Sequence, residues 1–424
     1  PSFALPMLPD FSRHLQTYAE ILLKIGLNLR AGQRLLITSV RTDGVPIETA
    51  PLIREVVRQA YQMGSPFVEV IWGDEAVRLA RFRYAPPDSF HHYATWHSDA
   101  LRDHSNRGDA VLNVAADNPT LLEGIDPERI ATARRTLLAF MAPYFQNVTR
   151  NAMNWLVAAA PVTGWAQKVF PGLSGEEAVD RLWDAIFRAC RVYESEPLLA
   201  WQRHIAELKA RSAHLNARRY DALRFRGPGT DLTVGLAEGH VWQAAQTTAA
   251  NGVSYTANIP TEEVFTAPHA RRVEGVVRAT MPLNLGGILI TDFTLEFANG
   301  RVVDAHAGQN QEALGRLLVT DEGASRLGEV ALVPHRSPIA RSGLLFYNTL
   351  FDENAASHIA LGRAYRDCIA GGEHMSEEEF AAAGGNNSLE HVDFMIGSGE
   401  IDVDGLRDGL SEPVMRAGEW AFPL

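Results

Sequence analysis

The chain has 424 residues, which exceeds the roughly 250–300 residues at which a single hydrophobic core stops growing, so two domains are expected. A formal net charge of -12 argues against nucleic acid and anionic membranes as partners. No apolar run approaches the ~20 residues of a membrane-spanning helix. The only cysteines are Cys190 and Cys368, which fits a reducing compartment such as the cytoplasm.

The first half of the chain alternates short apolar runs with amphipathic segments. Helices are expected over Phe11–Ile25, over Ala50–Met63 and from Asp74 onward. Buried strands are expected over Gln33–Val40, Pro66–Trp72, Ala110–Ala116 and Trp155–Ala160. Because strands separated by helices pair in parallel, this order predicts an α/β fold with a parallel sheet.

A helical region then leads to a change of pattern. Ser174–Glu177 has the spacing of a capping box, and the helix that it begins carries an apolar stripe ending at Cys190, which we interpret as a core residue. A second long helix is expected over Leu198–Ala217. The Gly- and Pro-rich segment Arg226–Thr230 is the strongest signal of a domain boundary.

Short β segments dominate after that boundary. Strands are expected over Asp231–Leu236, Glu274–Ala279, Gly287–Phe297 and Arg301–Ala305. Asn299 and Gly300, between the last two, are typical of a two-residue hairpin turn. Helices are expected over Gln311–Thr320 and Glu353–Tyr365. We therefore expect an α/β N-terminal domain over residues 1–225, and an α+β C-terminal domain with a largely antiparallel sheet over residues 226–424.

Several common catalytic motifs are absent. The sequence has no G-x-S-x-G, no H-E-x-x-H, no G-x-x-x-x-G-K-[ST] and no C-x-x-C. The segment Gly227-Pro-Gly229 lacks the third glycine of a dinucleotide-binding turn, so the α/β pattern does not indicate a nicotinamide-dependent dehydrogenase.

One polar segment resembles a metal cluster in composition. Its histidines and aspartates are His91, His92, His97, Asp99, Asp103 and His104. Metal sites need oriented ligands, and nothing in this segment fixes these side chains. We interpret the segment as a polar surface helix rather than as a metal site.

Carboxylates occur at unusual places in the second half. Glu262 and Glu263 lie in the segment Asn258–Pro268, and on an extended backbone they point to opposite faces. Only one of them can face a given site, which leaves the other for solvent or for supporting contacts. Glu329 opens the apolar segment Leu327–Val333, where a carboxylate is either solvated or bound to a positive group.

Imidazoles occur at two further places. In the last expected helix, with Asp352 as its N-cap, His358 and Tyr365 are seven residues apart and share one face. That face fits core packing, and it fits equally a ligand and a proton donor that line one cavity. His391 and Asp393 are two residues apart on an expected strand, so their side chains point the same way.

These positions together supply two Glu, two His and one Asp, and no thiolate. Mixed nitrogen and oxygen ligands suit zinc, cobalt or manganese in a hydrolytic site. Five ligands exceed the three that are typical of one catalytic zinc, and a pair of ions about 3.5–4 Å apart uses them better. Each residue alone is a weak signal, so the hypothesis depends on their joint occurrence.

Four segments make the sequence resemble the M29 metallopeptidases, the thermophilic or leucyl aminopeptidase family. They are NIPTEEVFTAP, LGEVALV, FYNTLFDENAASHIALGRAY and HVDFMIGS. The gaps between them also match: 66 residues from Glu263 to Glu329, 29 more to His358 and 33 more to His391. One departure is Ala356-Ser357, where the family pattern has Ser-Cys.

The resemblance implies an enzyme that removes N-terminal residues from peptides with a free N-terminus. It also implies two divalent ions per subunit and a homodimer. By position, the implied metal ligands are Glu263, Glu329, His358, His391 and Asp393. Tyr365 is implied to act on the tetrahedral intermediate. Our own hypothesis for the mechanism is that Glu329 or another carboxylate takes the proton of the attacking water, and that the free amine binds near the ions and a carboxylate.

Two other functions remain open from the residues themselves. The same two ions would serve the hydrolysis of a phosphoester or of a small amide. A protein without enzymatic activity, stabilised by metal for binding or scaffolding, would fill every coordination position. An open, exchangeable metal site favours the enzyme.

Overall fold

The computed structural model describes residues 8–285 and 288–424. It divides into two compact units, and each interrupts the other along the chain. The first unit holds the residues up to Arg203 and Gln246–Pro260, and the second holds His204–Ala245 and Thr261–Leu424.

The expected boundary at residues 225 and 226 differs from this division. These residues lie inside β7 (Ala222–Gly227), which pairs with β8 (Thr230–Leu236) as an antiparallel hairpin. The Gly-Pro-Gly segment forms the turn of that hairpin, and Gly229 has a φ of 75°, a conformation that favours glycine. Gly and Pro signalled a turn here, and the turn lies within one unit.

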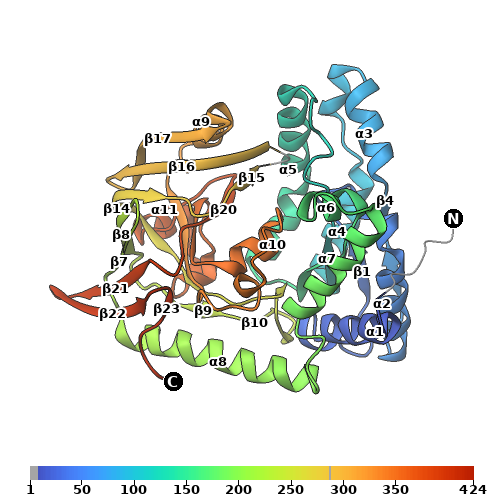
Figure 1. Cartoon of the computed structure of the whole chain (residues 1–424), viewed down its shortest axis with the longest axis horizontal. Helices are drawn as coiled ribbons and strands as arrows, with labels where there is room; N and C mark the ends of the chain where they lie inside the picture. The colour runs from blue at the N-terminus through green and yellow to red at the C-terminus, as the bar shows by residue number, and fades with distance from the viewer. Residues whose placement is uncertain (1–7, 286–287) are drawn as a thin grey trace. The chain divides into compact units, whose positions relative to one another are not determined.

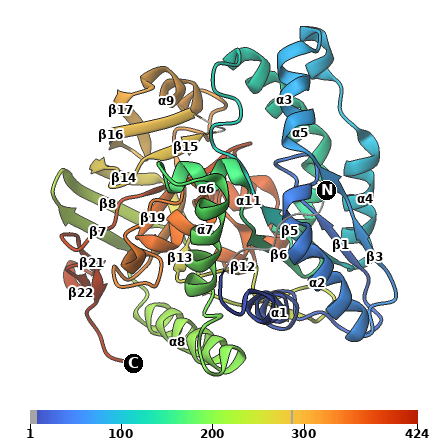
Figure 2. The same cartoon turned by 45° about the vertical axis from the view of Figure 1, so that its right-hand side comes forward.

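The first unit is built around a parallel sheet, as predicted. Its strand order is β12-β6-β5-β1-β3, and every pair is parallel. Figure 2 shows β1, β3, β5 and β6 of this sheet together. The strands are β1 (Leu35–Thr38), β3 (Val68–Val70), β5 (Ala110–Ala115), β6 (Trp155–Ala159) and β12 (Asn258–Ile259), with the short pairs β2 (Val45–Pro46) and β4 (Trp72–Gly73), and β10 (Thr247–Thr248) and β11 (Ser254–Tyr255).

Seven α-helices of the described residues belong to this unit, and an eighth crosses the division between units. They are α1 (Phe11–Ile21), α2 (Ala50–Gln62), α3 (Glu75–Tyr84), α4 (Thr95–Arg107), α5 (Pro127–Thr149), α6 (Thr163–Val169), α7 (Gly175–Ala189) and the crossing α8 (Pro197–Arg218) (Figure 1). No helix in the described part of the chain has the length and hydrophobicity that a membrane span requires.

The predicted capping box at the start of α7 is confirmed. The Ser174 side chain accepts from the backbone N–H of Glu177, and the Glu177 carboxylate accepts from the backbone N–H of Ser174. The helix buries Leu182 and Ile186, and Cys190 at its end is fully buried. Cys190 is therefore a core residue, as interpreted from the sequence.

The histidine-rich segment forms helix α4, but the expectation that this helix is a polar surface element is wrong for two side chains. His97 and His104 are each 2% exposed. The Nε2 of His97 lies 3.0 Å from Thr38 Oγ1, and Nδ1 of His104 lies 3.1 Å from the Ala100 oxygen. Within residues 8–285 and 288–424, this segment contributes to no metal-binding group of side chains. The histidines thus have packing and hydrogen-bonding roles.

The second unit contains a nine-stranded sheet and a five-stranded sheet. The larger has the order β15-β16-β14-β8-β7-β21-β22-β23, with β17 paired to β16. Its remaining strands are β14 (Pro268–Arg278), β15 (Leu283–Leu285), β16 (Ile288–Ala298), β17 (Arg301–Gln309), β21 (Asp402–Arg407), β22 (Leu410–Arg416) and β23 (Glu419–Trp420). Figure 1 shows β16 and β17 beside helix α9 (Gln311–Leu318).

The predicted hairpin in this sheet is confirmed. Ala298 pairs with Arg301, so Asn299 and Gly300 form a two-residue loop. Both have positive φ, 51° and 74°, as the primed turns of tight hairpins require. The expected strand began at Gly287, which lies outside the described residues.

The five-stranded sheet has the order β20-β19-β18-β13-β9, and all its pairs are antiparallel. Its strands are β9 (Gln243–Ala244), β13 (Val264–Thr266), β18 (Leu327–Leu332), β19 (His358–Gly362) and β20 (His391–Met395). One face carries Val330, Ile359 and Phe394 into a large hydrophobic core. Phe293 of the nine-stranded sheet joins the same core, with its ring centroid 5.2 Å from that of Phe394.

The helix predicted over residues 353–365 is wrong. The chain forms the short helices α10 (Thr349–Asp352) and α11 (Glu377–Ala382) nearby, but His358–Gly362 is strand β19. All five residues of this strand are buried, so the polar and apolar alternation that marks a strand is missing. The Asp352 carboxylate is no N-cap; it accepts from the backbone N–H groups of Phe346 and Asn348.

Glu75 in the first unit gives the stability a predictable pH dependence. Its carboxylate accepts from the Asn118 backbone N–H at 3.2 Å, and burial and the charge of Glu48 raise its pKa to about 7. The folded state therefore holds the Glu75 proton more tightly than the unfolded chain does. The stabilisation of the folded state by this proton is complete below about pH 4.5, and it is lost as the pH rises through 7. Glu75→Gln removes this change.

Urea unfolding between pH 4.5 and 8 checks the prediction. We expect the wild type to lose stability relative to Glu75→Gln as the pH rises. Glu123→Gln, an exposed glutamate of the same unit, is the matched control and keeps the wild-type slope. Parallel curves for the wild type and Glu75→Gln would contradict the prediction.

Candidate metal centre

The predicted site residues gather on the second face of the five-stranded sheet. Side chains alternate between the faces of a strand. Since Ile359 and Phe394 point into the core, His358, Asp393 and His391 point the other way. The register places Ala360 between Glu329 and Asp393. The small alanine side chain leaves room for the polar groups on either side of it.

The polar atoms form two groups that share one residue. Nε2 of His358 lies 3.1 Å from Glu263 Oε2 and 3.4 Å from Glu329 Oε1. Nε2 of His391 lies 3.7 Å from Glu329 Oε2 and 3.4 Å from Asp393 Oδ1. In each group of three residues, one ligand atom from each lies within 4.8 Å of the others. Glu329 therefore directs one carboxylate oxygen to each group.

A bulge in β18 sets the position of Glu329. Leu327 pairs with Leu361 while Glu329 pairs with Ala360, so Gly328 is the extra residue. A Cβ at Gly328 would lie 2.3 Å from the carbonyl oxygen of Gly362. A side chain there would collide with the neighbouring backbone, so this bulge requires glycine.

Backbone carbonyls fix the orientation of both imidazoles. Nδ1 of His358 lies 3.1 Å from the Ala356 oxygen, and Nδ1 of His391 lies 2.7 Å from the Arg363 oxygen. A carbonyl only accepts, so each Nδ1 carries the proton and donates it. Each Nε2 is then turned toward the carboxylates, which is the arrangement that metal-binding histidines use.

The carboxylates shift the pKa values of both imidazoles. Burial lowers the pKa of His391, but the charges of Asp393 and Glu329 outweigh this effect and raise it to about 9. Burial likewise lowers the pKa of His358, and Glu263 and Glu329 raise it well above its usual range. Both shifts express the same physical fact: positive charge is strongly favoured at these two nitrogens.

The donor set fits divalent cations. Nε2 of His358 and Oδ1 of Asp393 are buried, and neither forms a hydrogen bond of good geometry with another described residue. Buried polar atoms without partners are costly. Imidazole nitrogens and carboxylate oxygens, three residues in each group, form the ligand set of catalytic zinc and related ions.

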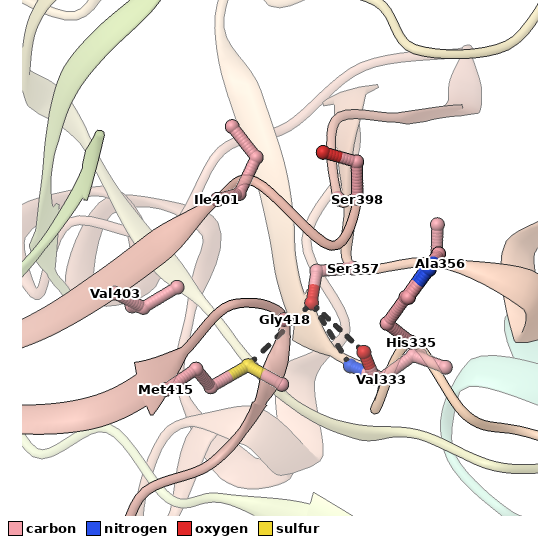
Figure 3. Close-up of a pocket in the computed structure, with 10 residues that line it drawn as sticks. Val333, His335, Ala356, Ser357, Ser398, Ile401, Val403, Met415 and Gly418 are labelled. Carbon is pink, nitrogen blue, oxygen red and sulfur yellow. Dashed lines mark hydrogen bonds between the residues drawn. The ribbon is translucent and has the colours of Figure 1, made fainter. Parts of the chain in front are cut away.

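A serine ties together the ends of the strands that carry these residues (Figure 3). The Ser357 hydroxyl lies 3.1 Å from the Val333 nitrogen and 3.2 Å from the Val333 oxygen, at the end of β18. The Ser357 carbonyl accepts from the N–H groups of Ile396 and Gly397, beyond β20. His358 follows directly, so Ser357 anchors the start of β19.

Tyr365 lies beside the two groups, although not on the predicted helix. It follows β19, and its ring centroid is 4.9 Å from that of His391. Burial and then the charges of Glu329 and Asp393 raise its pKa well above the usual range, so its phenol keeps its proton. A protonated phenol at this place is a hydrogen-bond donor to charge that develops near the two groups.

The structure adds residues that the sequence argument missed or left open. Glu262 points away from the site: it is 3% exposed, and its Oε2 lies 3.4 Å from His204 Nε2. Asn354 is fully buried and accepts from the Glu262 backbone N–H at 2.7 Å. Burial, and then the charges of Asp393 and Glu263, raise the pKa of Glu353 well above its usual range. The polar residues Asp352, Glu353 and Asn354, which precede a buried histidine by a few positions, were the available signal.

Comparisons with known proteins agree with this geometry. A family model described as thermophilic metalloprotease (M29) matches residues 11–420. Aminopeptidase 2 of Geobacillus stearothermophilus is 45% identical over 415 residues, which are 98% of this chain and 99% of that protein. Aminopeptidase T of Thermus thermophilus is 46% identical over 411 residues, 97% of this chain and 99% of that protein.

A solved structure shares the fold as well. Wild-type AmpT from Thermus thermophilus aligns with a TM-score of 0.90 at 46% identity, covering 97% of this chain and 100% of that one. The predicted combination of a parallel α/β sheet and antiparallel sheets is therefore confirmed. Because the family match extends over nearly the whole chain and the relatives are similar over their full lengths, this chain belongs to the thermophilic metalloprotease (M29) family.

Proposed function

We propose that this chain is a metal-dependent aminopeptidase that releases N-terminal residues from peptides. One observation carries the proposal: the two oxygens of Glu329 face two separate groups of side chains, each with an imidazole and a further carboxylate. This arrangement suits two ions that share a ligand. The named aminopeptidases to which the chain is 45–46% identical support peptides as the substrate.

The proposed ligands are the five residues predicted from the sequence. Glu263 and His358 would hold one ion, and His391 and Asp393 would hold the other. Glu329 would contribute to both sites, because its two oxygens face one group each. Zinc, cobalt and manganese all accept such nitrogen and oxygen ligands. When bound, a pair of divalent ions supplies an activated water and a Lewis acid for the scissile carbonyl.

The protein's own groups complete the chemistry. The Nδ1–H groups of His358 and His391 donate to backbone carbonyl oxygens, which keeps both imidazoles in one orientation through the reaction. Tyr365 donates its phenol proton as a hydrogen bond to the oxyanion that forms at the carbonyl. Glu329 was predicted both as a ligand and as the acceptor of the water proton. With both oxygens directed at the two groups, we assign it the ligand role.

Two other properties implied by the family resemblance, a homodimer and a count of two ions per subunit, stay predictions. The cytoplasmic location, inferred from the cysteine content, also stays a prediction. The metalloprotease family supports the use of divalent metal. Sedimentation velocity of the metal-loaded protein tests the dimer directly.

Removal of one ligand from either group should abolish turnover. A metal site supplies several kcal/mol of transition-state stabilisation, so His358→Ala and Asp393→Ala should each lower kcat on an aminoacyl p-nitroanilide by about 10³-fold or more. A chelator should have the same effect on the wild type, and added zinc, cobalt or manganese should reverse it.

His374→Ala replaces an exposed histidine of the same unit and serves as the matched control, with unchanged kcat. Circular dichroism of each variant verifies the fold. Full activity in His358→Ala or Asp393→Ala would show that the ligand assignment is wrong, and chelator resistance of the wild type would contradict the metal dependence itself.

Loss of the bridging carboxylate should be visible without any assay of activity. The wild type should bind about two divalent ions per chain, measured by mass spectrometry of metals after dialysis. Glu329→Gln keeps the size of the side chain but removes its charge, so the metal content should fall to about one ion or less. Glu378→Gln, on the exposed side of α11, should retain the wild-type content. A full content in Glu329→Gln would rule out the bridging role.

Tyr365→Phe should affect the transition state more than substrate binding. The loss of one hydrogen-bond donor to an oxyanion typically costs about 10²-fold in kcat. KM and the metal content should change little, because the phenol touches neither group as a ligand. Steady-state kinetics on a series of aminoacyl p-nitroanilides measure the effects on kcat and on KM separately. A rise of KM at constant kcat would instead place Tyr365 in substrate binding.

A further inference from the structure

Asn354 is a buried polar residue that the proposed mechanism leaves unused. It lies in the one-turn 3-10 helix Glu353–Ala355, between α10 and β19, and it is fully buried. Burial of a side-chain amide is unfavourable unless its oxygen and its nitrogen both form hydrogen bonds. The partners of this amide therefore show which parts of the chain it holds in place.

Both ends of the Asn354 amide have partners. The side-chain oxygen accepts from the Glu262 backbone N–H at 2.7 Å, and Nδ2 donates to the Leu350 carbonyl oxygen at 2.8 Å. A backbone N–H only donates and a carbonyl only accepts, so these two partners fix the orientation of the amide. The Asn354 carbonyl also accepts from the Ser337 hydroxyl at 3.0 Å. Asn354 is therefore held by hydrogen bonds to three different segments.

The bond to Glu262 fixes the backbone directly before a proposed metal ligand. Strand β13 pairs with β18 and β9 from Val264 onward. The Glu262 N–H lies just before the strand, and it bonds to Asn354 instead. Glu263 thus has a fixed backbone on both sides, with the Asn354 contact before it and the sheet after it. Because the direction of a side chain follows from its backbone, the contact also fixes where the Glu263 carboxylate points.

Asn354 also links two strands that are not neighbours in the sheet. In the first group of ligands, which is Glu263, Glu329 and His358, Glu263 directly precedes β13 and His358 begins β19, and β18 lies between these strands. Asn354, four residues before His358, joins the segments that lead to both ligands. Glu263 Oε2 and His358 Nε2 lie 3.1 Å apart, close to the about 3.3 Å expected between two ligands of one tetrahedral zinc ion.

The second group of ligands, which is Glu329, His391 and Asp393, needs no such link. His391 and Asp393 lie two residues apart on the single strand β20. The alternation of side chains along a strand is enough to place both on the same face. Loss of Asn354 should therefore disturb the geometry of the first group only.

We propose that Asn354 is a positioning residue that holds Glu263 at the distance from His358 that a shared divalent ion requires, and so sets the affinity of the first group for its ion. This inference rests on the proposed function and deepens it. Replacement of a residue that orients a metal ligand typically weakens metal binding by about 10–100-fold. The effect is expected for the ion of the first group and not for that of the second.

Each group can be tested alone once a ligand of the other is removed. Asp393→Ala leaves only the first group complete, and His358→Ala leaves only the second. The probe is zinc alone, and competition with a chromophoric chelator gives its Kd in each background. In Asp393→Ala protein, the addition of Asn354→Ala should raise the Kd for zinc by about 10–100-fold. In His358→Ala protein, the same addition should leave the Kd within about twofold.

Asn348→Ala is the matched control, because Asn348 is a second buried amide of the same segment. It is 6% exposed, and its side chain caps α10 by accepting from the Leu350 N–H at 3.2 Å. Loss of this cap should lower the urea midpoint of the metal-free protein and leave the Kd for zinc unchanged in both backgrounds. Circular dichroism verifies the fold of every variant. If Asn354→Ala does not fold, Asn354→Ser, whose hydroxyl is too short to reach the Glu262 N–H, takes its place with the same expected result.

Two results would overturn the inference. An unchanged Kd for zinc in the first group would show that Glu263 is held in place without Asn354. An equal rise of the Kd in both backgrounds would give Asn354 a general structural role. Failure of the proposed function looks different: a wild type that binds zinc at both groups, yet releases no residue from any aminoacyl p-nitroanilide, would not be an aminopeptidase and would leave the positioning role intact.

Discussion

The concentration of negative charge on one buried face is the constraint on which the site depends. Glu263, Glu329 and Asp393 are 7%, 5% and 9% exposed, and their atoms lie within a few ångströms of two imidazoles. Like charges so close together, away from water, are strongly unfavourable without cations. The charges of Asp393 and Glu329 raise the pKa of His391 to about 9, although burial lowers it. The fold must supply enough stability elsewhere to hold these groups together.

That stability comes from the opposite face of the same strands. Each strand that carries a polar group toward the site carries an apolar one into the core, and Ile359 and Leu361 are both fully buried there. Burial of such a side chain contributes roughly 1.5–3 kcal/mol. The sheet therefore cannot hold the charged groups of the site without also packing its apolar face into the core. A shift of register by one residue would exchange the charged face with the apolar face.

Much of this architecture could be predicted from the sequence. Parallel strands, the α7 capping box and the Asn299-Gly300 hairpin all depend on local patterns, and local patterns are what a sequence displays directly. The side chains at His391 and Asp393 could be placed on one face because a strand has a period of two residues.

The predictions that differ from the structure have a common physical cause. The strand His358–Gly362 looked like part of a helix because both of its faces are buried and its site-facing residues include alanine and glycine, so no alternation appears. Likewise, Gly229 signals only a local turn, and the division between units depends on contacts distant in sequence.

The chain passes between the two units more than once, and this path has a consequence for protein engineering. The chain leaves the second unit after Ala245 and returns at Thr261, two residues before Glu263. Glu263, a proposed metal ligand, therefore comes shortly after a segment, Gln246–Pro260, that belongs to the first unit. No single uninterrupted stretch of the chain holds the whole second unit. One excised segment would either omit His204–Ala245 or include Gln246–Pro260 of the first unit.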